Sequence, residues 1–142
     1  MHKNGAVSLL KEKGYTLVLY GDAECRTFTE RGVSPLLSLL ESGEDLRQYF
    51  AVDKVVGRAA AFLYIALGIR SVYAVTVSES AYRLMKEKGI EVEYEVRVDR
   101  ILNRTATGFC PMESAVLEES DPAAAIEKIR KTLLSLRKEA QK

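Results

Sequence analysis

The chain has very few of the residues from which metal centres and disulfide frameworks are built. It holds one histidine, His2, and two cysteines, Cys25 and Cys110, with no Cys-x-x-Cys and no His-x-Glu motif. Because a zinc site needs three or four well-spaced Cys, His or carboxylate ligands, the sequence predicts no metal and no cofactor. Ligand counting alone leaves a carboxylate-bound Mg²⁺ open. We expect a cytoplasmic protein. In that compartment two cysteines this far apart indicate free thiols rather than a disulfide.

Long apolar runs and an excess of one charge are also missing. No apolar stretch reaches membrane-spanning length without charges, and the run 6–10 is too short for a secretory signal. With 21 basic and 20 acidic residues the net charge is +1, which gives no broad footprint for nucleic acid. The 142 residues are 47% hydrophobic, so we expect one folded domain over 1–142.

Apolar periodicity predicts helices alternating with strands. We expect a strand pair that forms a hairpin, followed by single strands separated by helices, which indicates an α/β fold with a mixed sheet. The strand over 91–98 alternates strictly and should have one wet face near a sheet edge. The predicted strands are 15–20, 24–30, 72–77 and 91–98, and the predicted helices are 6–13, 35–42, 53–67, 79–88, 111–119 and 122–140.

The most informative segment is Cys110-Pro111-Met112-Glu113. Proline suits the first position of a helix, which makes Cys110 the N-cap and Glu113 the third helical residue. A thiol there faces the positive end of the helix dipole, which favours the reactive thiolate. The alternative is a buried filler thiol, with Glu113 reaching back to cap its own helix. The chain has no second histidine to pair with Cys110, which excludes a Cys–His nucleophile.

The expected helix over 53–67 is apolar on nearly every side and should be buried against the sheet. Asp53 would be its N-cap. Lys54 would lie in the first turn, where a cation opposes the helix dipole, and this makes the pair a candidate for a functional pocket. The alternative is that Asp53 only caps the helix while Lys54 points into water.

Two polar loops are candidate ligand contacts. Ser78 and Ser80 follow a buried strand and open a helix, the place where α/β sheets bind ligands, although Ser78 can be a cap alone. Asn103 and Arg104 lie just before Cys110, and the guanidinium could hold a phosphate or carboxylate. The alternative for the second loop is a polar surface segment.

Three segments together resemble a known family, the domain of unknown function family 1893. They are Gly32–Leu37, Asp53-Lys54-Val55-Val56-Gly57-Arg58-Ala59-Ala60 and Asn103–Glu113, and the resemblance spans roughly residues 6–137. It implies a cytidine-deaminase-like fold, which is a three-layer α/β/α sandwich whose mixed sheet starts in a β-hairpin.

The resemblance also implies a changed pocket. Deaminases hold zinc with a His-x-Glu or Cys-x-Glu motif at the start of the buried helix and a Pro-Cys-x-x-Cys motif after the next strand. Here Asp53-Lys54-Val55 and Ser78–Tyr82 would take those places, without a zinc ligand or the usual glutamate. We therefore expect the scaffold to be kept with a metal-free pocket.

The first functional hypothesis is a metal-free enzyme or ligand-processing protein. Cys110 would be nucleophile or thiol carrier, and Asp53 or Glu113 would transfer protons. Lys54 and Arg104 would orient a small molecule of anionic or nucleotide-like character. Whether the chain is catalytic at all stays open.

Two alternatives belong to other classes of protein. One is a non-catalytic module that binds a small molecule or nucleotide. The other is a structural or interaction protein that acts through a dimer face on strand 91–98 or the last helix, so a homo-oligomer is left open.

Overall fold

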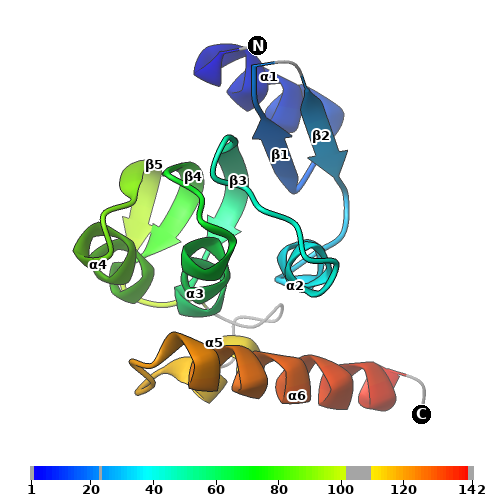
Figure 1. Cartoon of the computed structure of the whole chain (residues 1–142), viewed down its shortest axis with the longest axis vertical. Coiled ribbons are helices and arrows are strands. Elements are labelled where there is room, and N and C mark those ends of the chain that lie inside the picture. The colour runs from blue at the N-terminus through cyan, green and yellow to red at the C-terminus, as the bar shows by residue number, and fades with distance from the viewer. Residues whose placement is uncertain (1, 23, 102–109, 141–142) are drawn as a thin grey trace.

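One five-stranded mixed sheet organises the molecule (Figure 1). The computed structural model describes residues 2–22, 24–101 and 110–140. The strand order is β2-β1-β3-β4-β5, with β1 antiparallel to β2 and to β3, while β3, β4 and β5 run parallel. The strands are β1 (Leu17–Tyr20), β2 (Cys25–Phe28), β3 (Phe50–Val56), β4 (Ser71–Ser78) and β5 (Glu91–Val98). The predicted hairpin and mixed sheet are confirmed.

Helices cover both faces of the sheet. The helices are α1 (Lys3–Lys13), α2 (Ser34–Glu41), α3 (Arg58–Leu67), α4 (Glu79–Glu87), α5 (Pro111–Val116) and α6 (Pro122–Ala140). On one face α1 buries Ala6 and Leu10 against Val18 and Val52 of the sheet. On the other face α2, α3 and α4 close a larger core, and α5 and α6 pack on the outer side of α3 (Figure 1). This arrangement confirms the expected three-layer α/β/α fold.

The predicted helix over 53–67 is wrong in its first part. Residues 50–56 form the central strand β3, and α3 begins only at Arg58. Asp53 is therefore not an N-cap, because it lies in the middle of a strand between Leu17 of β1 and Ala74 of β4. The β-branched residues around the charged pair suit a strand buried between two neighbours.

The later elements lie where the apolar pattern places them. Strand β5 has the predicted bounds, and α4 and α6 match the predicted helices over most of their length. In the described part of the chain, no helix combines the length and apolar character needed to cross a membrane.

Candidate functional site

A cleft opens at the edge where β3 and β4 end and their crossover helices begin. The enclosed space is small, about 30 Å³, and the volume reaches about 390 Å³ when the open mouth is included. In open α/β sheets this edge is where ligands bind, because loops and helix N-termini meet there. The cleft is lined by Arg58, Ser78, Ser80, Asp99, Arg100, Ile101, Glu113, Ser114 and Leu117.

Glu113 connects α5 to the start of α3. The backbone N–H of Arg58 donates to Oε1 at 2.6 Å, and that of Ala59 donates to Oε2 at 3.0 Å. Glu113 thus caps α3, and the alternative in which it reaches back to cap its own helix is wrong. Burial raises the pKa of Glu113, and the two N–H bonds and the Arg58 charge oppose this effect without cancelling it.

Gly57 leaves the space that Glu113 fills. A Cβ added to Gly57 would lie 2.3 Å from Oε1 and 2.6 Å from Oε2 of Glu113. Its φ of −103° is open to any residue, so the requirement for glycine here is one of space and not of backbone conformation. Gly57 and Glu113 are therefore a matched pair.

Arg58 lines the cleft and clamps α5. Its Nε donates to the carbonyl of Val116 at 3.0 Å, its Nη1 donates to Ser80 Oγ at 3.0 Å, and its Nη2 donates to the carbonyl of Glu119. The guanidinium carbon also lies 5.1 Å from the ring centroid of Phe62. Sequence reasoning missed this role, although Arg58 is the one charged residue in the helix 58–67.

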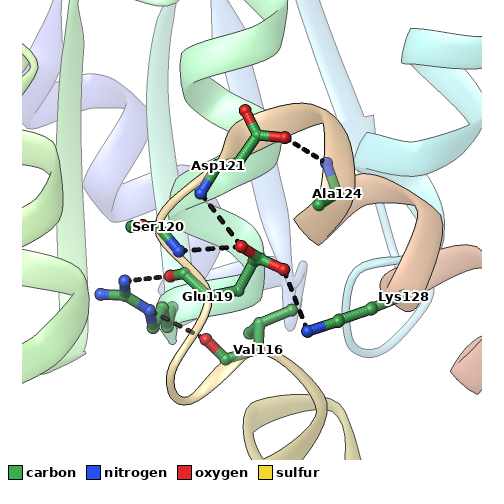
Figure 2. Close-up of polar contacts among 7 residues, drawn as sticks. Val116, Glu119, Ser120, Asp121, Ala124 and Lys128 are labelled. Carbon is green, nitrogen blue, oxygen red and sulfur yellow. Dashed lines mark hydrogen bonds and ion pairs between the residues drawn. The ribbon is translucent and has the colours of Figure 1, made fainter.

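The connection from α5 to α6 is fixed by Glu119 (Figure 2). Its carboxylate accepts from the N–H groups of Ser120 and Asp121 and pairs with Lys128 Nζ at 2.9 Å. Asp121 in turn accepts from the N–H of Ala124 in the first turn of α6. These bonds hold the carbonyl of Glu119 in position for the Arg58 guanidinium.

The two predicted serines both lie in the cleft. Ser78 is 1% exposed, and its Oγ accepts from the N–H of Ala81 at 3.1 Å, so it caps α4 as the sequence predicted. Ser80 is half-buried, and its oxygen accepts from Arg58. A hydroxyl both accepts and donates, so Ser80 can still donate its proton to a ligand.

Asp53 and Lys54 lie elsewhere. Asp53 is buried and accepts from the hydroxyl of Tyr64 at 2.6 Å, and burial raises its pKa to about 7. Lys54 is exposed on the same strand, and its N–H donates to the carbonyl of Thr16. Neither residue lines the cleft that Glu113, Ser78 and Ser80 share.

Cys110 is half-buried and stands at the predicted N-cap of α5, where its side chain makes no capping hydrogen bond. Its backbone N–H donates to the carbonyl of Ile101 at 3.2 Å. Ile101 lines the cleft, but Cys110 is not among the lining residues, and its side chain packs against the apolar core. The other two predicted ligand contacts, Asn103 and Arg104, lie outside the described residues.

The residues at the start of α3 and α4 do not fit zinc. The helix start that was expected at Asp53-Lys54-Val55 is at Gly57-Arg58-Ala59, so a guanidinium and serine hydroxyls stand at this corner. A fixed cation repels Zn²⁺, and hydroxyls do not replace thiolate or imidazole ligands. Among the described residues, no three His, Cys, Asp or Glu side chains are grouped so that they could hold a metal ion.

Residues 5–133 match the family model described as "TM1506: Domain of unknown function (DUF1893)". The chain belongs to this family. It is similar to the crystal structure of a DUF1893 family protein (TM1506) from Thermotoga maritima, with 28% identity and a TM-score of 0.82 over 95% of this chain and 92% of that chain. No curated protein matches the chain.

A second solved structure shares less with this DUF1893 chain. It is a diaminohydroxyphosphoribosylaminopyrimidine deaminase/5-amino-6-(5-phosphoribosylamino)uracil reductase from Thermotoga maritima, with 18% identity and a TM-score of 0.42 over 80% of this chain and 39% of that chain. At that TM-score the likeness assigns neither fold nor activity. The DUF1893 membership predicted from the sequence segments is confirmed, and two of those segments meet through Gly57 and Glu113.

Proposed function

We propose that the protein binds a small polar molecule in the cleft and that Glu113 exchanges a proton with it. The observation that carries the proposal is a half-buried carboxyl, with a raised pKa, that lines an open cleft together with serine hydroxyls. Perturbed carboxyls in clefts are enriched at functional sites. Ile101 and Leu117 add the apolar walls that small-molecule sites have.

The contacts of Arg58 and Glu113 favour an uncharged group over an anion beside these two residues. The N–H groups at the start of α3, which would attract an anion, already bind the Glu113 carboxylate. Three N–H bonds of the Arg58 guanidinium are directed to Ser80, Val116 and Glu119. The ligand that fits therefore carries a hydroxyl or amino group toward Glu113.

Filling the mouth of the cleft should abolish most of the binding. We expect ligand-observed NMR with a library of polar metabolites to find a binder, and Leu117→Trp to weaken its affinity by about tenfold or more. Leu134→Trp is the matched control, because Leu117 is 51% exposed and Leu134, on α6, is 55% exposed. Equal affinity of the wild type and Leu117→Trp would place the ligand outside the cleft.

Glu113→Gln separates proton exchange from a purely structural cap. With Glu113 present, the affinity should change with pH as the carboxyl titrates, and this change should disappear in the variant. A structural cap alone would lower the thermal stability of Glu113→Gln and leave the pH profile of binding unaltered.

A second candidate is ligand processing by the Cys110 thiol, which the bond between the backbones of Cys110 and Ile101 favours. In a Cys25→Ala background, a bound ligand should slow alkylation of Cys110 several-fold, and Leu117→Trp should remove that protection. Lys54→Ala should change nothing, because Lys54 lies exposed on β3. Alkylation at the same rate with and without ligand would rule out a thiol in contact with the ligand.

A further inference from the structure

Strand β5 offers a long free edge. Among the described residues its only strand neighbour is β4, and Figure 1 shows it at the end of the sheet opposite the hairpin. The strand has eight residues without a proline, and it exposes 39% of Tyr94 and 50% of Val96. An edge strand that is long, regular and partly apolar is a template for pairing with another strand.

The sequence of this edge is self-complementary. Val92-Glu93-Tyr94-Glu95-Val96 reads the same in both directions. When two copies of a strand pair antiparallel around a two-fold axis at Tyr94, the two tyrosines lie opposite each other and Val92 lies opposite Val96 of the second copy. Aromatic pairs and pairs of β-branched residues across strands are favourable.

The charges at the ends of this segment also match. In the same register Glu91 of one copy lies opposite Arg97 of the other, on both sides of the axis. Arg97 is already engaged within its own protomer. Its guanidinium carbon lies 4.9 Å from the ring centroid of Tyr82 and 5.6 Å from that of Tyr94, and its Nε pairs with Glu79 of α4 at 2.9 Å. Glu91 is exposed and has no ion pair among the described residues.

In this register Glu93 of one copy lies opposite Glu95 of the other, and the repulsion between them is reduced because each is paired with a lysine of its own protomer. Lys3 Nζ lies 2.6 Å from Glu93 Oε2, and Lys11 Nζ lies 2.7 Å from Glu95 Oε2. Charges on an edge strand ordinarily prevent association, and their pairing with lysines of α1 weakens this protection.

We propose that β5 pairs antiparallel with β5 of a second copy of this chain around a two-fold axis at Tyr94. The two five-stranded sheets then form one continuous sheet. The interface is isologous, as expected for a two-fold dimer, in which each contact occurs twice. Strand pairing alone buries less than the roughly 1,200–2,000 Å² of a standard interface, so we expect a dimer that dissociates at micromolar concentration.

Charge reversal at the ends of the register tests the pairing. In sedimentation velocity over a concentration series, Glu91→Arg should raise the dissociation constant of the dimer by about tenfold or more. The new arginine then lies opposite Arg97 of the other copy on both sides of the axis. The double variant Glu91→Arg/Arg97→Glu restores opposite charges across the axis and should bind more tightly than Glu91→Arg alone, although below wild type because Arg97→Glu also breaks the ion pair with Glu79. Glu30→Arg makes the same charge change far from β5, just beyond β2, and should leave the dimer unchanged.

A cross-link tests the register without charge changes. In a Cys25→Ser/Cys110→Ser background, Tyr94→Cys should form an intermolecular disulfide on mild oxidation, since position 94 lies on the axis. Val96→Cys alone should not, because its partner is Val92. A chain that stays monomeric at all concentrations, or a dimer that Glu91→Arg leaves intact, overturns the proposal, and so does a Tyr94→Cys variant that forms no disulfide.

Discussion

Replacing Arg58 with methionine is expected to lower the free energy of unfolding by about 2–4 kcal/mol. The substitution removes three side-chain hydrogen bonds that join α3 to Ser80 and to the carbonyls of Val116 and Glu119. Methionine keeps much of the apolar stem, so the loss reports on the guanidinium bonds rather than on packing. Urea denaturation monitored by circular dichroism measures the change.

Arg83→Met is the matched control, because Arg83 carries the same side chain on α4. It is 77% exposed and pairs only with Glu79 among the described residues. An exposed ion pair of this kind is worth about 0–1 kcal/mol, so the control should be close to wild type.

Arg58→Met should destabilise α5 locally as well as lower the free energy of global unfolding. The clamp joins the carboxyl end of α5 to the start of α3, so amide hydrogen exchange in 111–119 should accelerate more than in β3 or β4. A loss equal to that of Arg83→Met, or exchange that accelerates evenly along the chain, would show that the clamp contributes nothing specific to α5.

The sequence predicts most of the fold because most elements have local signals. The strict alternation over 91–98 predicts β5 with its observed bounds, and proline at 111 and at 122 predicts the starts of α5 and α6. The hairpin and the buried strand β4 follow from β-branched and aromatic runs.

Strand β3 is not predicted, because its local sequence resembles the start of a helix. Within 50–56, a charged pair interrupts an apolar run, and an aspartate before a helix resembles an N-cap. What makes Asp53 acceptable in a central strand is the Tyr64 hydroxyl, which comes from the next helix and is visible only in the folded chain. Long-range partners of this kind override local propensity.

The residues of the candidate site also divide into those that the local sequence predicts and those that it does not. Ser78 and Glu113 are predicted because each stands next to a recognisable helix start. Arg58 is missed, since a helix begun at residue 53 makes it an interior residue, whereas the observed helix begins with it. Glu113 capping a helix 54 residues earlier in the chain has no signature in local sequence.

The stability of the wild-type protein should fall as the pH rises from about 4 to 8, chiefly because of Asp53. Burial raises the pKa of this carboxyl to about 7, against about 3.9 in an unfolded chain. The folded state therefore binds more protons than the unfolded state between these values. The stabilisation that protonated Asp53 contributes is fully present below pH 4 and is lost as the pH rises through 7. Above about pH 8 the unfolding free energy no longer changes because of this group.

The size of this effect follows from the difference between the two pKa values. A shift of about three units corresponds to roughly 4 kcal/mol between the two ends of the window. Asp53→Asn cannot ionise, so its unfolding free energy should vary less with pH, and at pH 9 the variant should exceed the wild type. Glu113, whose pKa is also raised, acts in the same direction in both proteins. The difference between the two curves therefore isolates Asp53.

Tyr64→Phe provides the complementary test. The Tyr64 hydroxyl donates to Asp53 and favours its ionised form, so removing the hydroxyl should raise the pKa of Asp53 further. The fall in stability should then extend to higher pH than in the wild type. Urea midpoints measured from pH 4 to pH 9 give both curves. If the wild type and Asp53→Asn show the same pH dependence, the carboxyl of Asp53 is solvated in the folded protein and its burial does not control stability.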